Sequence, residues 1–600
     1  MVASRHSVEQ HISLSGTNSA KQLELHRIGR SNSRLRFSSA GNVCVAGRFA
    51  KTRFRNDEVS TNTHPMAVRR LIPIFIAVLA ATGGPAETQS RDRAAVPRVH
   101  LAISCQSSQG EFDRAVELLH NFFFPETVKA FKAIIQHDPN CAMAYWGLAM
   151  SQRPNPLVPP FPRANLVAGW EAAQRGKLAK EQTPRESQYL SAIEAFYRDY
   201  DSVDQLTRTR RYENEMHRLH QRYPNDSEAA IFYALALNEA VDFKDTSFSR
   251  QRKAAAILKF EARKHPFHPG IAHYIIHSYD FAPLAARALP SADLYGMLAA
   301  DAPHALHMPS HTYSMLGMWE NSILANRAAM AASAAYAARN FPEATDPALP
   351  HLLDFLVYAY LQLGKDKEAR QILGSLSKLK PFASVRLTVD TALAAMPARF
   401  ALERGRWDEA ADLPVRDSQY LPAQSISYFA RALGSARSGK SDAALNEISH
   451  LQGIKDRLAA TKDDFWAGQT DVQIEAAEAW VLFGQGRRSE AVARMRHAAD
   501  LDDTSVKNVA MENKLVPMRE LFGELYAASG NNINALAQFE RSLKANPNRF
   551  RSLAGAAIAA RRAGQAATAK RFYRALLTLT RASDGDRTEI VDAKSYLASN

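Results

Sequence analysis

The sequence repeats itself near its C-terminal end with a period of about 34 residues, which is the length of one helix-turn-helix unit. Gly530 and Gly564 are one period apart, and so are Ala535 and Ala569. A Gly followed five residues later by a small residue recurs upstream, and the seven pairs are Gly317/Ser322, Gly364/Ala369, Gly405/Ala410, Gly439/Ala444, Gly486/Ala491, Gly530/Ala535 and Gly564/Ala569. A fixed period of this length is typical of an array of helix pairs, because each unit buries its apolar face only against its neighbours. The period therefore predicts an all-α fold.

These residues resemble the tetratricopeptide repeat, in which two antiparallel helices stack on the next pair. That family's small residue at the helix contact, its turn Gly, its later Ala and its closing Pro have counterparts at Gly523, Gly530, Ala535 and Pro547. Small residues let the helices approach closely, Gly permits the turn, and Pro ends the second helix. The resemblance implies a right-handed superhelical solenoid from about residue 100 to 600.

The repeats divide this solenoid into four stretches. Residues 98–250 are predicted to be degenerate N-terminal helical repeats, and residues 251–345 to be His-rich repeats. Residues 346–470 are predicted to be the middle repeats, and residues 471–600 the C-terminal repeats.

A candidate secretory signal covers residues 66–86. It begins Met66-Ala-Val-Arg-Arg, continues through about a dozen apolar residues and ends in small residues, which are the parts of a signal peptide. It is too short for a comfortable membrane span, so we expect no stable span in the mature chain. We expect residues 1–65 to be a disordered leader or a mis-annotated start, and the chain to be periplasmic or secreted. The alternative is a buried apolar helix.

The formal net charge of +14 is concentrated near the N-terminus. Residues 1–65 carry ten Lys and Arg against four Asp and Glu, and Arg69 and Arg70 add two more basic residues. The remaining 63 basic and 57 acidic residues give only a weak excess, with no basic stripe interleaved with aromatics. We therefore expect no nucleic-acid partner.

Two cysteines, Cys105 and Cys141, lie in the expected mature chain, and Cys44 lies in the leader. Two cysteines in an oxidising compartment can pair. Two antiparallel helices are expected between them, at about 110–122 and 125–137, and such a pair returns the chain to its starting end. We predict a Cys105–Cys141 disulfide, and the alternative is two unrelated buried thiols.

Eight of the nineteen histidines fall between residues 265 and 351. His273 and His307 are separated by one repeat period, and so are His277 and His311. Within each unit the two histidines are spaced i, i+4, which puts both rings on one helix face. Each pair is therefore equivalent to the other by repeat.

Counting by repeat adds further residues at corresponding positions of neighbouring units. In the tetratricopeptide repeat, the positions of His307 and His311 face the concave groove. The resemblance implies that seven candidate ligands line one stretch of groove: His273, His277, His304, His307, His311, His351 and Asp354.

Imidazole together with a carboxylate suits Zn, Cu, Fe or Ni, and this composition predicts a transition-metal site. Helix axes about 8 to 10 Å apart allow neighbouring helices to share one ion. The alternative is that each histidine is a hydrogen-bonding or helix-capping residue, because Pro269 and Pro309 stand where proline begins a helix.

The stretches CAMAYWGLAM and HMPSHTYSMLGMW resemble an uncharacterised group of exported bacterial tetratricopeptide-repeat proteins. The resemblance implies fold and compartment, and it brings no reaction with it.

Three functions follow from these patterns. The first is a binding module that holds a peptide or protein in its groove, with Trp146, Tyr313 and Tyr358 providing contact area. The second is a metal-dependent enzyme that uses the solenoid as a scaffold, with an open metal position beside Tyr313, Tyr358 or Asp280. The third is a purely architectural solenoid with incidental histidines.

Overall fold

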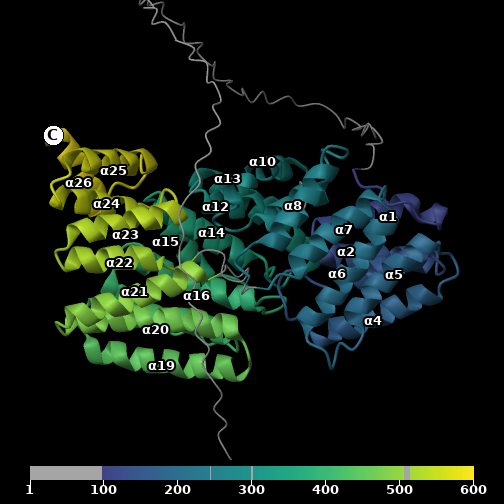
Figure 1. Cartoon of the computed structure of the whole chain (residues 1–600), viewed down its shortest axis with the longest axis horizontal. Helices are drawn as coiled ribbons and strands as arrows, with labels where there is room; N and C mark the ends of the chain where they lie inside the picture. The colour runs from purple at the N-terminus through teal and green to yellow at the C-terminus, as the bar shows by residue number, and fades with distance from the viewer. Residues whose placement is uncertain (1–97, 243–244, 299–301, 506–513, 600) are drawn as a thin grey trace, which may run out of the picture. The chain divides into compact units, whose positions relative to one another are not determined.

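The computed structural model describes residues 98–242, 245–298, 302–505 and 514–599. Helices are the regular elements of these ranges (Figure 1), and two isolated β-bridges pair Cys141 with Glu181 and Thr345 with Phe382. The all-α prediction is confirmed. The predicted leader, the predicted signal peptide and Cys44 lie outside the described residues.

The helices follow one another with short connections. The first are η1 (Gln106–Ser108), α1 (Gln109–His120), α2 (Phe124–His137), α3 (Ala142–Ser151), α4 (Arg163–Leu178), α5 (Pro184–Tyr197), α6 (Gln205–Arg222), α7 (Ser227–Glu239) and α8 (Ser249–Glu261). The His-rich part contains α9 (Pro269–Ser278), η2 (Ala285–Arg287), α10 (Leu289–Leu298), α11 (Pro303–His307), α12 (Pro309–Met315), α13 (Trp319–Asn340) and α14 (Leu349–Gln362). The remainder are α15 (Asp366–Leu376), α16 (Leu387–Leu402), α17 (Trp407–Ala411), α18 (Leu421–Arg437), α19 (Ser441–Ala460), α20 (Asp464–Gly484), α21 (Arg488–Thr504), α22 (Met518–Ala528), α23 (Asn532–Ala545), α24 (Phe550–Arg562), α25 (Ala566–Leu579) and α26 (Thr588–Ser599). Over the described residues, no helix is both long and apolar enough to cross a membrane.

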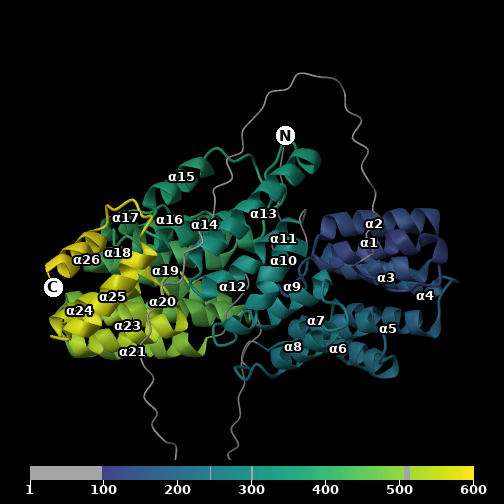
Figure 2. The same ribbon diagram turned by 90° about the horizontal axis from the view of Figure 1, so that it is seen from above.

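Consecutive helices pack against each other, as α18 does on α19 and α19 on α20. Alternate helices also touch, with α14 on α16, α16 on α18 and α18 on α20, so the first helices of neighbouring units form a layer. Figure 1 shows α19 to α24 stacked in chain order, and Figure 2 shows the helices from above. The predicted array of consecutive helix pairs is confirmed.

The seven predicted turn glycines have the backbone conformation that the repeat requires. Each has a positive φ, between +63° at Gly405 and +79° at Gly530, a region that residues with a Cβ adopt only at a cost. The small residue five positions later is fully buried in all seven units, from Ser322 to Ala569. Gly523 faces the ring of Phe539, where a Cβ would lie 2.8 Å from a ring carbon. Close helix approach therefore depends on these small residues.

The C-terminal repeats return to contact the turns of earlier repeats. Trp319 Nε1 donates to the carbonyl of Asn548 at 2.8 Å, and Asn548 Nδ2 donates to the carbonyl of Gly317 at 3.2 Å. Arg587 forms an ion pair with Asp366 at 2.6 Å. These partners are 221 to 231 residues apart, which spans between five and six of the units marked by the turn glycines. The array therefore curves until one unit meets another that is five to six units away.

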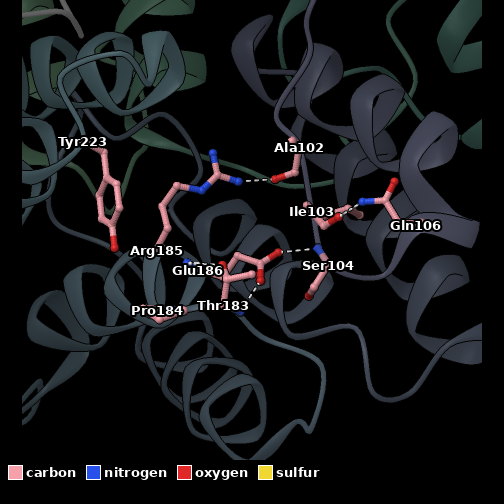
Figure 3. A pocket seen from close by; sticks show the side chains of 9 residues that line it. All are labelled: Ala102, Ile103, Ser104, Gln106, Thr183, Pro184, Arg185, Glu186 and Tyr223. Atoms are coloured by element: carbon pink, nitrogen blue, oxygen red, sulfur yellow. Dashed lines mark hydrogen bonds between the residues drawn. The ribbon is translucent and has the colours of Figure 1, made fainter.

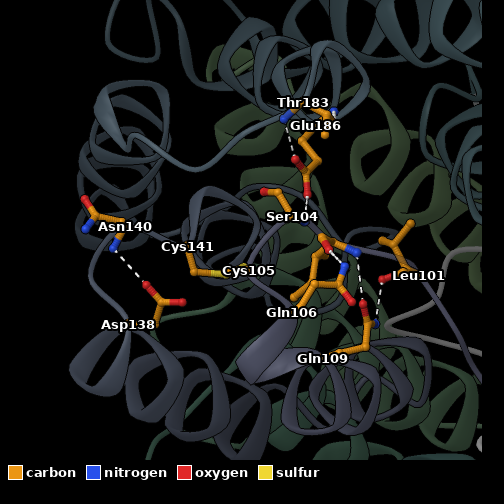
Figure 4. The surroundings of a disulfide bond; sticks show 11 residues. Leu101, Ser104, Cys105, Gln106, Gln109, Asp138, Asn140, Cys141, Thr183 and Glu186 are labelled. Atoms are coloured by element: carbon orange, nitrogen blue, oxygen red, sulfur yellow. Dashed lines mark hydrogen bonds between the residues drawn. A yellow bond between two sulfur atoms is a disulfide. The ribbon is translucent and has the colours of Figure 1, made fainter.

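Cys105 and Cys141 are joined by a disulfide, with their Cα atoms 5.4 Å apart (Figure 4). Both are buried, and α1 and α2 form the antiparallel pair between them. Cys141 immediately precedes α3, and the isolated bridge to Glu181 holds it there. Closing a loop of this length contributes up to about 4 kcal/mol in the chain-entropy treatment. The crosslink is consistent with an oxidising compartment.

We expect Gly317→Ala to destabilise the protein more than Gly439→Ala. Both glycines have positive φ, so each substitution costs about 1 kcal/mol of backbone strain. At Gly317 a Cβ would also lie 2.2 Å from the carbonyl oxygen of Pro547, whereas nothing lies within 4 Å at Gly439. Urea unfolding followed by circular dichroism measures both losses. Equal losses would show that the contact between distant repeats is not formed in solution.

Candidate metal centre

Four short segments deliver the clustered histidines. His273 and His277 lie one turn apart on α9, and His304 and His307 lie at i, i+3 on α11. His311 lies on α12 and His351 on α14. The helix that the repeat predicts around residue 308 is divided into α11 and α12, because Pro309 has no N–H to donate.

The first cluster, which we call triad one, consists of His273, His277 and His304. The Nε2 atom of His273 lies 3.0 Å from Nε2 of His277 and 3.2 Å from Nε2 of His304. His273 Nδ1 lies 2.7 Å from the carbonyl oxygen of His120 and donates to it. The ring of Phe122 packs against all three imidazoles. Triad one is therefore a convergent set of imidazole nitrogens with an apolar cover.

The second cluster, triad two, consists of His307, His311 and His351. His307 Nε2 and His311 Nε2 are 2.9 Å apart, and the ligand atoms of the whole triad lie within 4.8 Å of one another. The ring of Phe355 packs against all three imidazoles. The two triads thus have the same composition and the same kind of cover.

Triad two is triad one displaced by one repeat. His273 and His277 become His307 and His311 after one repeat period. His304 and His351 have the same separation in the sequence as the turn glycines Gly317 and Gly364. Each triad therefore takes two histidines from the first helix of one unit and the third from the next unit. The intervening unit is longer because α13 has 22 residues.

Hydrogen bonds fix which nitrogens of triad two carry protons. His307 Nδ1 donates to Asn326 Oδ1 at 2.7 Å, and Asn326 Nδ2 donates to the Ser322 carbonyl, which sets the amide orientation. His311 Nδ1 donates to Asp280 Oδ2 at 2.9 Å. With both Nδ1 atoms protonated, each neutral ring presents a lone pair at Nε2. In that state the two lone pairs face each other across 2.9 Å, and a cation bound between them would make the contact favourable.

Protons are poor candidates for that cation. Burial lowers the pKa of His273 to about 3, and the backbone hydrogen bond to His120 only partly opposes this effect. Burial also holds the pKa of His304 and of His307 well below the ordinary value, and neighbouring histidines add to the depression. The neutral imidazole, which is the form that binds metal, is therefore the stable form of these rings near pH 7.

A buried hydrogen-bond network around Glu228 connects to triad one through His120. Glu228 accepts from His120 Nε2 at 2.9 Å and from His268 Nε2 at 2.8 Å. Burial alone would raise the pKa of Glu228, but His268 and His120 lower it below its ordinary value. At Gly270 a Cβ would lie 2.4 Å from the His120 ring, so glycine lets α9 approach. This network positions His120, whose backbone carbonyl accepts the hydrogen bond from His273 Nδ1.

The structure gives the surroundings of the seven predicted ligands. Asp354 is not a member of either triad, because its Oδ1 accepts from Arg399 Nε at 2.9 Å. The histidines are also not displayed on a groove surface. The exposed fractions of His273, His277, His307 and His311 are 0%, 7%, 2% and 3%, because successive helices and the Phe rings cover them. His304 and His351 are half-buried.

Three supporting residues were not predicted as such. Asp280 was expected beside an open metal position, and it instead anchors His311. Asn326 and His120 carried no signal in the sequence, because they come from other helices and lie 19 and 153 residues from the rings they orient. Only the three-dimensional packing identifies them.

In the described part of the chain, two of the cavities lie away from the triads. One, of about 340 Å³, is lined by aromatic and charged side chains that include Trp319, Tyr358, Phe429, Trp466, Asp502 and Arg519. The other is an open pocket between η1 and the start of α5, where Glu186 accepts from the Ser104 N–H and Arg185 donates to the Ala102 carbonyl (Figure 3). Trp146 is fully buried and does not provide the contact area expected of it.

The class of this protein is defined by its own architecture. No protein family model matches the sequence, and no curated protein matches it. The APC/C hetero-tetramer Cut9–Hcn1 has a TM-score of 0.27 and 10% identity, over 82% of this chain and 97% of that one. The human IFIT1 dimer with PPP-AAAA has a TM-score of 0.33 and 12% identity, over 80% of this chain and 96% of that one. Likenesses this weak support no inference. The repeat period and the paired helices define a tetratricopeptide-like helical repeat protein.

We expect the metal-free protein to lose stability as the pH falls below about 6.5. The pKa of His273 is about 3 when folded, so the unfolded chain binds this proton first. The loss is at most about 1.4 kcal/mol per pH unit for each such histidine, down to the folded pKa. In EDTA, the free energy of unfolding of His273→Gln should depend less steeply on pH than that of the wild type between pH 6.5 and 5. The difference should correspond to about one proton taken up on unfolding. Exposed His497→Gln is the control, and parallel curves for all three proteins would contradict the assignment.

Proposed function

We propose that this protein is a metal-binding helical repeat protein whose two histidine triads each hold a transition-metal ion. The facing Nε2 atoms of His307 and His311 carry this proposal, because both rings donate through Nδ1 and face each other across 2.9 Å. Two nitrogens bound to one tetrahedral ion at about 2.0–2.1 Å lie roughly 3.3 Å apart. The observed separations of 2.9 to 3.2 Å between Nε2 atoms are close to that value.

The anchoring bonds support this proposal independently of the distances. Metal-binding imidazoles usually donate their second N–H to a carboxylate or a carbonyl, which fixes the tautomer and the ring orientation. Asp280, Asn326 and the His120 carbonyl fill these positions. Six imidazoles suit Zn, Cu, Fe or Ni.

If the bound metal catalyses a reaction, the protein is a metal-dependent enzyme that uses the solenoid as a scaffold. Three protein ligands leave one position of a tetrahedral ion for water or substrate. Two hydroxyls expected near that position have other partners, since Tyr313 donates to Asp293 and Tyr358 is bound by Arg549. Export to the periplasm or the exterior is part of the proposal, and the Cys105–Cys141 disulfide supports it.

We expect the untagged protein to carry stoichiometric transition metal, and His277→Ala and His351→Ala each to lose about half of it. Each replacement removes one of three ligands, so the affected triad loses its coordination geometry. Elemental analysis after gel filtration measures the content. His497→Ala, which changes an exposed histidine on α21, should keep the full amount. If the wild-type protein stays free of metal even after incubation with Zn, Cu, Fe or Ni salts, the triads are not metal sites and their histidines are architectural.

A peptide or protein ligand is the second proposed function. It is supported by the cavity of about 340 Å³, where Trp319, Phe429 and Trp466 give flat apolar area beside Asp502 and Arg519. Aromatic residues beside charged ones are typical of binding sites. A phage-displayed random peptide library selected on the full chain should yield peptides that bind Trp466→Ala at least tenfold more weakly. If the selected peptides bind the wild type and Trp466→Ala equally well, the cavity is not their binding site.

A further inference from the structure

The two triads share a helix, and a hydrogen bond also connects them. Helix α11 gives His304 to triad one and His307 to triad two, three residues apart on a helix of five residues. Side chains at this spacing are neighbours, with Cβ atoms about 5–6 Å apart. Asp280 follows α9, which carries the other two ligands of triad one, and accepts a hydrogen bond from His311 of triad two. An ion in one triad would therefore be a neighbour of an ion in the other, with α11 shared between them.

The charge of the surroundings restricts which pair of ions fits. All six donors are imidazoles, which contribute no negative charge when they bind metal. Asp280 supplies one carboxylate next to triad two, and Glu228 supplies one behind triad one, where it is shared by His120 and His268. The carboxylate of Asp354 is paired with Arg399. Two divalent ions repel each other about four times as strongly as two monovalent ions at the same separation. Burial of both triads increases that penalty, because little water is available to screen it.

We propose that the two triads form one dinuclear centre that holds a pair of copper(I) ions. This inference rests on the proposed metal-binding function and specifies its metal. Copper is among the metals that imidazole suits. Copper(I) is monovalent and is stable with three ligands, whereas zinc almost always takes four. Phe122 and Phe355 cover the two triads with apolar rings, which favours an ion that needs no additional water ligand.

The first test is the stoichiometry and the choice of ion. The untagged apo-protein is titrated anaerobically with copper(I) in competition with bicinchoninate, and separately with zinc(II) in competition with a chromogenic chelator. We expect two copper(I) per chain for the wild type and for His497→Ala, and one for His277→Ala and for His351→Ala. Zinc(II) should fill the second site at least tenfold more weakly than the first, because the second divalent ion meets the charge of the first.

The results separate this inference from the function on which it rests. Tight binding of two zinc(II) ions and weak binding of copper(I) would overturn the copper(I) pair and leave the metal-binding function intact. A single copper(I) per wild-type chain would overturn the dinuclear centre alone. Failure to bind any metal would overturn both. If His277→Ala loses its helical circular dichroism, His304→Gln replaces it, because the amide is close in size and the ring is half-buried.

The second test asks whether the two ions are neighbours. Ferricyanide removes one electron from each bound copper(I) and leaves copper(II), which has an unpaired spin. We expect wild-type protein to give a broadened, spin-coupled paramagnetic resonance spectrum with a half-field transition. His277→Ala should give the spectrum of one isolated copper(II). Two independent copper(II) signals in the wild type would show that the triads are separate sites.

Discussion

The close approach of two helices at a fully buried small residue is the contact on which the rest of this fold depends. It recurs in seven units, each time five residues after a glycine in the left-handed region. A larger side chain at a close helix contact forces the helices apart, and at Gly523 even a Cβ would lie 2.8 Å from a ring carbon of Phe539. Because the contact fixes the geometry of each unit, residues separated by one repeat occupy equivalent places. Two pairs of histidines separated by one repeat period therefore produce two similar triads.

The sequence was sufficient to predict the parts of the structure that depend on this period. The turn glycines, the buried small residues and the face shared by His273 and His277 all follow from local spacing. Burial of the histidines did not follow, because Phe122 covers triad one from a distant part of the chain, and Phe355 of α14 covers His307 and His311 from the next unit. Asp354 was expected as a ligand on spacing alone, and its pairing with Arg399 of α16 depends on how the next unit packs. Repeat counting gives positions along a helix, and it does not give the partner of a buried charge.

Contacts between distant repeats add a constraint that no local pattern contains. Arg549 is fully buried and forms ion pairs with Glu520 and Glu403, while Phe550 N–H donates to Gln362. A buried arginine is stable only when its hydrogen bonds are satisfied, so α24 is held at one place against the earlier units. Trp319 and Tyr358, which line the cavity of about 340 Å³, lie on this interface and contact Asn548 and Arg549. The wall of the cavity is therefore held by partners that are far apart in the chain.

The protein contains its own comparison between a histidine whose two ring nitrogens have complementary partners and the histidines of triad two. His268 accepts the Ile271 N–H through Nδ1 and donates through Nε2 to Glu228, so both ring nitrogens have complementary partners. His307 and His311 are equally buried, yet both donate through Nδ1 and direct their Nε2 lone pairs at each other. Histidines that serve only packing would be expected to resemble His268, because facing lone pairs in a low-dielectric interior are unfavourable. A metal ion bound by both Nε2 atoms would resolve that conflict, and burial, which holds the pKa of His307 well below its ordinary value, disfavours a proton on that ring.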